Sequence, residues 1–326
     1  MLRKTLIIIL SSILLGFLAF KISPWPGALI IRLLFNYGGR KANTELQNHV
    51  PSGIIEVRDQ QFDPENRSLL FDVYYPRTDT LVPMIVWTHG GAFVSGNKGM
   101  IENYAKILAA KGYAVFCLDY SIAPESRYPI PLKEVNRALK YISDNHQKYF
   151  ADRRFIIMGG DSAGAMITAQ VANIITNPDY SDALGISPGI DPGQLKGVLL
   201  YCGFYDLDLI LGKGSPGFFI RTVSWSYFGN RKLPTDGSLK TASVSGYLTD
   251  RFPPVFISAG NADPLLEQSE YFAKKLRENG IRTDELFFEK GHVPGLGHEY
   301  QFTMDRYGKQ ALERSMFFIE SINKGH

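Results

Sequence analysis

The chain has 326 residues, of which 45% are hydrophobic, and its 35 basic and 32 acidic residues give a formal net charge of +3. This length can bury one large core or two modest ones. The near balance of charge, with no long basic block, excludes a protein that follows a nucleic-acid backbone. The sequence has no internal repeat and no Cys/His spacing typical of zinc sites, and we expect neither a metal nor a cofactor.

The first predicted element is an apolar segment, Thr5–Phe20, which follows Arg3 and Lys4 and ends at Lys21. Its length lies between the apolar core of a signal peptide and a membrane span of about 20 residues. Because no small-residue cleavage site follows, we expect residues 1–23 to form an uncleaved signal anchor, with the rest of the chain on the extracytoplasmic side. A buried N-terminal helix is the alternative.

Residues 24–53 predict a linker with a short amphipathic helix. Two prolines, Pro24 and Pro26, end the membrane segment, and Ala28–Phe35 is apolar except for Arg32. This helix either lies on the membrane surface or forms part of a lid over the following domain.

The third predicted region, residues 54–326, reads as an α/β domain. Short apolar runs predict strands at Ile54–Val57, Leu69–Tyr75, Met84–Thr88, Ala114–Leu118, Phe155–Met158, Gly197–Tyr201, Val255–Ala259 and Asp284–Phe288. Helical patterns lie between or after them at Asn103–Lys111, Leu132–Tyr149, Ala163–Ile175, Leu265–Asn279 and Lys309–Ile322. Buried strands alternating with helices predict a mostly parallel, doubly wound sheet, opened by an antiparallel pair. Functional side chains of such sheets gather at the carboxyl ends of the strands.

A glycine-rich loop, His89–Phe93, follows the predicted strand Met84–Thr88. Its sequence is His-Gly-Gly-Ala-Phe, and consecutive glycines leave backbone N–H groups free to point toward one spot. Acyl transfer needs such donors for the oxygen that becomes negative in the tetrahedral intermediate. We assign this role to the amides of Gly91 and Ala92, with His89 and Gly90 as supporting residues of the loop; a plain glycine turn is the alternative.

The strongest motif is Gly160–Gly164, Gly-Asp-Ser-Ala-Gly, between a predicted strand and a predicted helix. A serine at such a corner is held in a strained turn that exposes its hydroxyl, and the flanking glycines avoid clashes with the neighbouring strand and helix. Ser162 is therefore the candidate nucleophile, and the Ala163 amide is a third oxyanion donor. A second match to the same spacing, Gly185–Gly189, lies in a polar stretch and predicts a surface loop.

Residues 204–251 interrupt the alternation because they contain no clear strand. This segment carries Phe204, Tyr205, Phe218, Phe219, Trp225, Tyr227 and Phe228. We expect an inserted helical cap whose aromatic side chains line an apolar pocket; a long loop packed on the sheet is the alternative.

An acid and a base complete the candidate site. Asp263 follows the strand Val255–Ala259, where a carboxylate can orient a histidine ring and stabilise its charged form. An ordinary helix N-cap would explain this residue equally. Of six histidines, only His292 and His298 fall in the loop after the last strand, and ordered sequence resumes directly after His298. We therefore assign His298 as the base and keep His292 as the alternative. The order nucleophile, acid, base matches that of the α/β-hydrolases.

From about Ile54 to the C-terminus, the chain resembles the hormone-sensitive-lipase-like branch of the α/β-hydrolases, which includes arylacetamide-deacetylase-like carboxylesterases. The resemblance rests on His89–Phe93, Asp119–Glu125, Gly160–Gly164 and Asp263–Leu265. It implies a supporting rather than reacting role for Glu125. Ala92 stands where a third glycine is more usual, and the histidine loop is longer than in many relatives.

The expected activity is hydrolysis of small-molecule carboxylic esters with short to medium acyl chains by Ser162, His298 and Asp263. An amidase, deacetylase or peptidase on the same fold is the first alternative, since these reactions share the tetrahedral intermediate. A hydrolase-like scaffold that only binds is the second. The two cysteines, Cys117 and Cys202, lie in strand-like surroundings and predict free, buried thiols.

Overall fold

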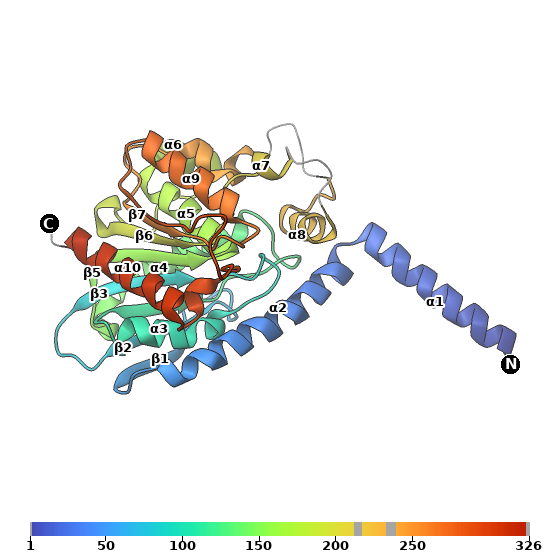
Figure 1. Cartoon of the computed structure of the whole chain (residues 1–326), viewed down its shortest axis with the longest axis horizontal. Coiled ribbons are helices and arrows are strands. Elements are labelled where there is room, and N and C mark those ends of the chain that lie inside the picture. Colours follow the sequence, from blue (N-terminus) through green and yellow to red (C-terminus); the bar gives the residue numbers. More distant parts are fainter. Residues whose placement is uncertain (1, 212–216, 233–238, 324–326) are drawn as a thin grey trace.

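The structure is a computed structural model that describes residues 2–211, 217–232 and 239–323. Within these residues, eight strands form one sheet in the order β1-β2-β4-β3-β5-β6-β7-β8 (Figure 1). Their bounds are β1 Ile54–Gln61, β2 Leu70–Pro76, β3 Val82–Thr88, β4 Ala114–Leu118, β5 Ala151–Asp161, β6 Leu195–Tyr201, β7 Val255–Ser258 and β8 Thr283–Leu286. The pairs β1–β2 and β2–β4 are antiparallel and all other neighbours are parallel. The predicted α/β architecture, a mostly parallel sheet opened by an antiparallel pair, is confirmed.

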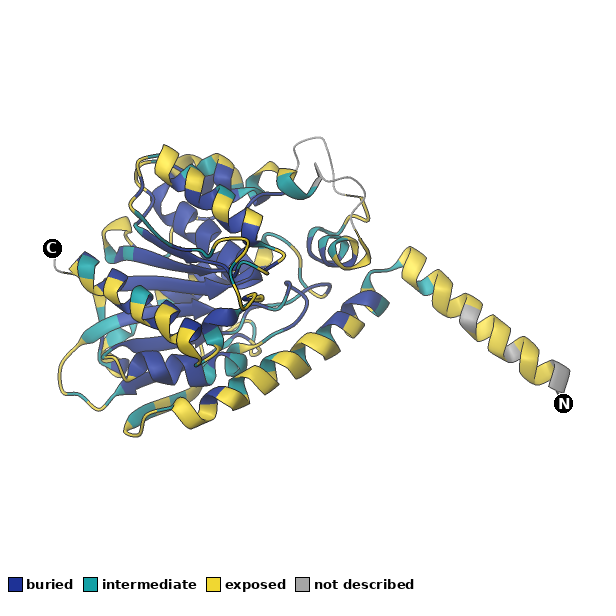
Figure 2. Ribbon diagram, in the orientation of Figure 1, coloured by how far each residue is buried: buried dark blue, intermediate teal, exposed yellow. Residues whose placement is uncertain are grey.

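Helices cover both faces of the sheet. Their bounds are α1 Leu2–Ile22, α2 Trp25–Leu46, α3 Glu102–Ala109, α4 Ile130–Asp144, α5 Ala163–Thr176, α6 Pro178–Leu184, α7 Asp208–Leu211, α8 Phe218–Phe228, α9 Leu266–Glu278 and α10 Arg306–Asn323. Side chains of α4, α5 and α9 share one hydrophobic cluster with one face of the sheet. Side chains of α3 and α10 pack with the other face in a second cluster. The strands between these layers are buried on both faces, which explains their near-continuous apolar sequences (Figure 2).

The first two helices differ in their relation to the sheet. Helix α1 extends away from the body and its described residues are almost all exposed, whereas α2 runs along the body and buries one side (Figures 1 and 2). The segment Lys4–Ile22 is long and apolar enough to cross a membrane. The alternative of a buried N-terminal helix is wrong, because none of this segment is buried inside the structure.

Helix α2 is much longer than the predicted apolar helix Ala28–Phe35. It continues through Gly38 and Gly39 to Leu46. A side chain at Gly39 would collide with Met100, so the absence of one lets α2 pack against the segment before α3. Packing has here overcome the low helix propensity of glycine.

The inserted segment 204–251 contains α7, α8 and two short 3₁₀ helices, Lys240–Ala242 and Val244–Tyr247. Its described residues include no strand, as the sequence predicted. Residues 212–216 and 233–238 of this segment lie outside the described residues.

Candidate active site

Ser162 occupies the corner between β5 and α5, with φ of +50° and ψ of −117°. This is a strained conformation for a residue with a side chain, and close packing enforces it. A Cβ atom at Gly160 would collide with the carbonyl of Gly164, and one at Gly164 would collide with the carbonyl of Thr88. The two glycines therefore allow the helix to begin directly against the sheet, with the serine at the turn.

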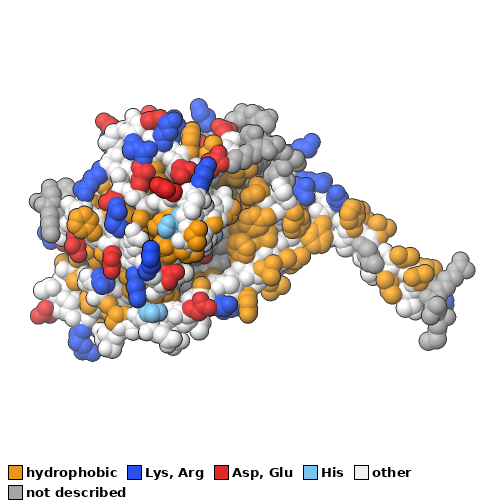
Figure 3. All heavy atoms as spheres, in the orientation of Figure 1, with side chains coloured by type: hydrophobic (Ala, Val, Ile, Leu, Met, Phe, Trp, Pro, Cys, Tyr) orange, Lys and Arg blue, Asp and Glu red, His pale blue; other side chains and the backbone are white. Residues whose placement is uncertain are grey.

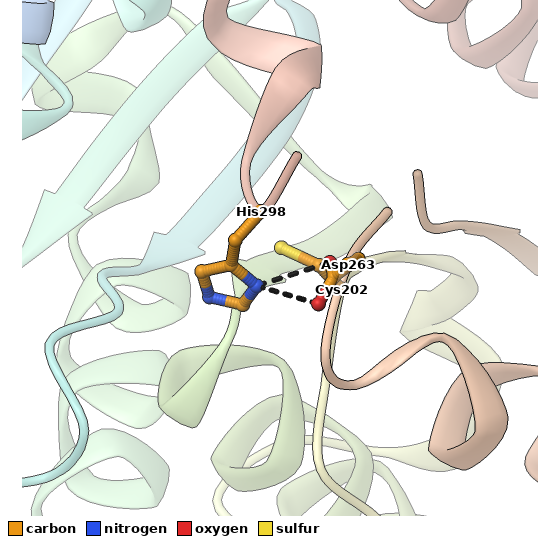
Figure 4. Close-up of side chains that lie close together, drawn as sticks. All are labelled: Cys202, Asp263 and His298. Atoms are coloured by element: carbon orange, nitrogen blue, oxygen red, sulfur yellow. Dashed lines mark hydrogen bonds and ion pairs between the residues drawn. The ribbon is translucent and has the colours of Figure 1, made fainter. Parts of the chain in front are cut away.

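His298 connects the serine to the acid. Its Nε2 lies 3.0 Å from Ser162 Oγ, and its Nδ1 lies 3.0 Å from both carboxylate oxygens of Asp263. Asp263 follows β7 and is buried, while the histidine side chain keeps 31% of its surface exposed. The structure thus brings together the three side chains that the sequence selected, at the carboxyl ends of β5 and β7 and in the loop after β8. Figure 4 shows the contact between His298 and Asp263.

Cys202 is a further neighbour of the imidazole and was not singled out from the sequence as part of the site. It follows β6 and lies beside His298 and Asp263 (Figure 4). Burial lowers the pKa of His298, but Cys202 and the hydrogen bond to Asp263 raise it by more, so the net pKa shift is upward. Burial raises the pKa of the Cys202 thiol to about 11, which keeps it protonated near neutral pH. Of its two neighbours, Asp263 therefore carries the charge that stabilises the imidazolium.

Cys202, Asp263 and His298 lie close enough together to be considered as ligands of one metal ion. Their candidate ligand atoms all lie within 4.8 Å of one another. A thiol must lose its proton to bind a metal, and burial raises the pKa of Cys202 to about 11. The Nδ1 atom of His298 is already hydrogen-bonded to the Asp263 carboxylate. The cluster therefore fits a proton-transfer site better than a metal centre.

The loop His89–Phe93 provides free donors beside Ser162. Gly91, Ala92 and Phe93 have φ values of +113°, +53° and +62°, and the Gly91 carbonyl accepts hydrogen bonds from the amides of Val94 and Ser95, which follow the loop. Among the described residues, no group accepts a hydrogen bond from the amides of Gly91, Ala92 or Ala163. Ala92 and Ala163 line the same cavity as Ser162. These amides are available to bind an oxyanion next to the serine.

Asp161, the second residue of the Gly160–Gly164 motif, fixes this loop. One carboxylate oxygen accepts a hydrogen bond from the Trp87 indole at 2.8 Å, and the other accepts one from the Gly90 amide at 2.8 Å. Burial, and then the negative charge of Glu299, raises the pKa of Asp161 to about 8. The contact with Trp87 could not be predicted from the sequence, because the two residues are 74 positions apart.

His89, which the sequence predicted as a supporting residue, contacts the loop and its surroundings. Its Nδ1 donates to the carbonyl of Gly90 at 2.6 Å, and its ring stacks on Tyr120 with 4.3 Å between ring centroids. Burial lowers the pKa of His89 to about 4, so the ring is neutral near pH 7. A neutral ring enclosed in this way supports the loop and takes no part in proton transfer with Ser162.

Glu125 supports the site through a helix that the sequence did not connect to it. Both of its carboxylate oxygens accept hydrogen bonds of 2.7 Å from Arg32 of α2. The same guanidinium donates to the carbonyls of Val94 and Ala123. The hydrogen bond from Arg32 is the main cause that lowers the pKa of Glu125. Arg32 therefore joins α2 to the segment that follows the glycine-rich loop.

The alternative histidine occupies a different environment. The His292 ring packs against Phe288 and Tyr307, with centroid distances of 5.0 and 5.2 Å. Among the described residues, no hydrogen bond joins the His292 ring to Ser162. The second glycine-serine match also lies elsewhere, since Ser187 is an exposed loop residue. Both thiols are free and buried, as predicted.

Two cavities meet at the serine and the histidine. The larger, of about 680 Å³, is lined mostly by apolar side chains of the inserted segment, including Phe204, Ile220 and Val223, and by Phe35 of α2. The smaller, of about 250 Å³, lies between α2 and the glycine-rich loop and includes Asn43 and Glu299. Ser162 and His298 line both cavities, so two parts of one ligand can lie on either side of the hydroxyl.

The mostly parallel eight-stranded sheet with helices on both faces defines the fold as that of an α/β-hydrolase. The BD-FAE family profile matches residues 71–276, and the chain belongs to this family. The sequence is 25% identical over 276 residues to Esterase LipQ of Mycobacterium tuberculosis. That match covers 82% of this chain but 62% of the relative, so the chain spans less than two thirds of LipQ.

Solved esterase structures share the fold. Esterase B of Lactobacillus rhamnosis superimposes with a TM-score of 0.77 and 18% identity, covering 92% of this chain and 97% of that one. An esterase of Pyrobaculum calidifontis gives a TM-score of 0.71 and 22% identity, covering 97% and 98%. EstE1, a carboxylesterase cloned from a metagenomic library, gives a TM-score of 0.69 at 20% identity. This match covers 93% of this chain and 98% of that one.

Proposed function

We propose that the protein is a serine hydrolase that cleaves small carboxylic esters through an acyl-enzyme intermediate. The observation that carries this proposal is the imidazole of His298, which bridges Ser162 Oγ and the Asp263 carboxylate at 3.0 Å on each side. The similarity to Esterase LipQ supports ester substrates.

In the first half of the reaction, Ser162 Oγ attacks the ester carbonyl carbon while its proton passes to Nε2 of His298. The carbonyl oxygen becomes negative and receives hydrogen bonds from the amides of Gly91, Ala92 and Ala163. Asp263 accepts the Nδ1–H bond and stabilises the imidazolium. The imidazolium then gives its proton to the departing alkoxide, and the alcohol leaves.

In the second half, water attacks the acyl group on Ser162. His298 takes a proton from this water and returns it to Ser162 Oγ as the carboxylic acid departs. No step of this reaction requires a metal or an organic cofactor.

The apolar lining of the larger cavity favours a short to medium acyl chain. We assign residues 204–251 as a cap over the hydrolase domain, since Phe204 and Val223 of this segment form part of the cavity wall. Esterase B of Lactobacillus rhamnosis, which shares the fold, has been solved with a tributyrin phosphonate, an analogue of a short-chain ester. Residues 1–23 anchor the chain in a membrane through α1, with the hydrolase domain on the extracytoplasmic side.

Substitution of the nucleophile tests this proposal. We expect Ser162→Ala to lower the turnover of p-nitrophenyl butyrate by about four to six orders of magnitude, because no other group forms the acyl-enzyme. A fluorophosphonate probe should label the parent chain and not this variant. Ser187→Ala is the matched control, since it removes the serine of the second glycine-serine match and should change neither result.

Turnover by Ser162→Ala at the parent rate would overturn the assignment. An amidase or deacetylase would also react with the probe, so esters and amides of the same acyl group are to be compared on the parent chain. Faster cleavage of the amides would favour that alternative.

A further inference from the structure

The first half of α2 exposes large hydrophobic side chains along one side. These are Trp25, Leu29, Ile30, Leu33, Leu34 and Tyr37, and Leu33 keeps 72% of its surface exposed. The opposite side, with Ala28 and Ile31, is buried against the body. Beyond Tyr37, the exposed residues include Arg40 and Lys41. A change from hydrophobic to basic residues along one exposed side is typical of a helix that lies in a lipid interface.

Helix α8 extends this surface. Phe218 and Phe219 are 49% and 40% exposed. The ring of Phe219 lies 5.7 Å from that of Phe35 in α2, and the ring of Phe218 lies 6.2 Å from that of Phe20 in α1. The exposed side chains named for α2, together with Phe218 and Phe219, are called the α2–α8 face below; hydrophobic side chains gather along this part of the molecule in Figure 3.

The α2–α8 face borders the larger cavity. Phe35 and Phe219 line this cavity together with Ser162, and each keeps about two fifths of its surface exposed. The two rings therefore belong both to the cavity wall and to the outer surface. A molecule that lies against the face can reach the serine between α2 and α8 without crossing the polar surface of the body.

Basic residues surround the point where α1 joins the body. A small cavity of about 200 Å³ between α1 and α8 is lined by Lys21, Arg221 and Arg231. Lysine and arginine side chains gather at this junction in Figure 3. A membrane helix that emerges at such a group places cations at the depth of lipid phosphates, where anionic headgroups attract them.

We propose that the α2–α8 face lies in the interface of the bilayer that α1 spans, and that the larger cavity takes a lipophilic ester directly from this bilayer. The inference rests on the proposed esterase function and its membrane anchor. Only two residues lie between the end of α1 at Ile22 and the start of α2 at Trp25. Because this connection is short, it keeps the α2–α8 face beside the membrane surface. The lipid phase concentrates apolar esters, and the face would deliver them beside Ser162.

A fluorescent label tests docking without any need for turnover. The full chain carrying Leu33→Cys is labelled with nitrobenzoxadiazole and placed, one chain per disc, in nanodiscs of phosphatidylcholine and phosphatidylglycerol. The native thiols do not compete, because Cys117 and Cys202 are buried and burial raises the pKa of both. We expect blue-shifted emission that is quenched by doxyl-labelled lipids. Leu81→Cys, at a site 45% exposed and away from the face, is the control and should emit as in water.

Water-like, unquenched emission from the label at position 33 would overturn the proposal. A blue shift that develops only when several chains share one disc would mean that a second copy covers the face, and this would overturn it as well.

Kinetics separate docking from chemistry. We expect Leu33→Glu to lower the turnover of p-nitrophenyl decanoate dissolved in the bilayer by about tenfold, because a charge replaces an exposed leucine that the proposal places in the lipid interface. Turnover of water-soluble p-nitrophenyl acetate should stay unchanged, and Leu81→Glu should alter neither rate. An equal loss with both substrates, or no loss with either, would contradict delivery from the membrane. An inactive parent chain would instead count against the esterase function.

Discussion

In the mechanism that we propose, the protonation state of His298 decides whether Ser162 can be activated, because only a neutral imidazole accepts the serine proton. Burial lowers the pKa of His298, but the net shift is upward, above the ordinary value of 6.5, and the Asp263 carboxylate is the neighbour that carries the stabilising negative charge. Below this pKa the ring is charged and cannot act as a base. Turnover should therefore rise with pH as the ring loses its proton.

Asp263→Asn tests this electrostatic account. Removing the carboxylate takes away the negative charge that favours the imidazolium, so the acid limb of the kcat/KM profile should move to lower pH. We also expect kcat to fall by about four orders of magnitude, because the amide no longer holds the catalytic tautomer. Asp179→Asn, at an exposed position of α6, should leave the profile unchanged. An unshifted acid limb in Asp263→Asn would contradict a charge effect of this carboxylate.

At this scale, the sequence predicted the residues that stand at strand ends and inside short motifs. Ser162, Asp263 and His298 could be selected because the fold type fixes where such positions meet. The roles of Asp161 and Cys202 could not be found in this way. Asp161 accepts hydrogen bonds from Trp87 and Gly90, which are 74 and 71 positions away in the sequence, and Cys202 reaches His298 only through the turn after β6.

Helix α2 contributes to the site through one guanidinium. Arg32 donates 2.7 and 2.8 Å hydrogen bonds to the carbonyls of Val94 and Ala123, and a two-bond pair to Glu125. Val94 follows the glycine-rich loop directly in the sequence. A planar, five-donor group can make these contacts together, whereas a lysine ammonium cannot.

We expect Arg32→Lys to lower kcat about tenfold while KM changes little, because the loop amides lose alignment with the transition state more than with the bound ester. The measurement is steady-state hydrolysis of p-nitrophenyl butyrate. Arg40→Lys, at an exposed position of the same helix, is the control. A change in KM alone, or an equal effect of both substitutions, would show that Arg32 does not position the loop.

The strands and most helices were predicted within a few residues, because their sequence patterns follow from burial on one or both sides. The length of α2 was not predicted, because Gly38 and Gly39 interrupt its hydrophobic pattern. Only contact with the body explains why the helix continues. The hydrogen bonds between Arg32 and Glu125 could not be predicted from the sequence for the same reason. The residues are 93 positions apart, and their contact depends on how α2 lies on the sheet domain.

At the scale of the whole molecule, α1 is separate from the hydrolase body. Its segment Lys4–Ile22 is apolar, and none of it is buried inside the structure. In water, this apolar surface would be exposed to solvent at a cost in free energy. The hydrocarbon core of a bilayer would cover it at little cost in free energy. The length and the apolar surface of α1 therefore support the membrane anchor that we propose.

Two lysines in the middle of α1 should release the protein from the membrane. Leu10→Lys with Leu14→Lys costs roughly 5 to 7 kcal/mol for insertion, at about 2.5 to 3.5 kcal/mol for each charge near the centre of a span. We expect the parent chain to stay in the membrane pellet after alkaline carbonate extraction and the double variant to appear in the supernatant. Leu81→Lys, outside α1, should behave as the parent. Because, among the described residues, the side-chain hydrogen bonds of Ser162, His298 and Asp263 join them to one another and none joins them to α1, the released variant should hydrolyse p-nitrophenyl acetate at the parent rate. Extraction of the parent chain itself would contradict the anchor and leave the assignment of the three site residues intact.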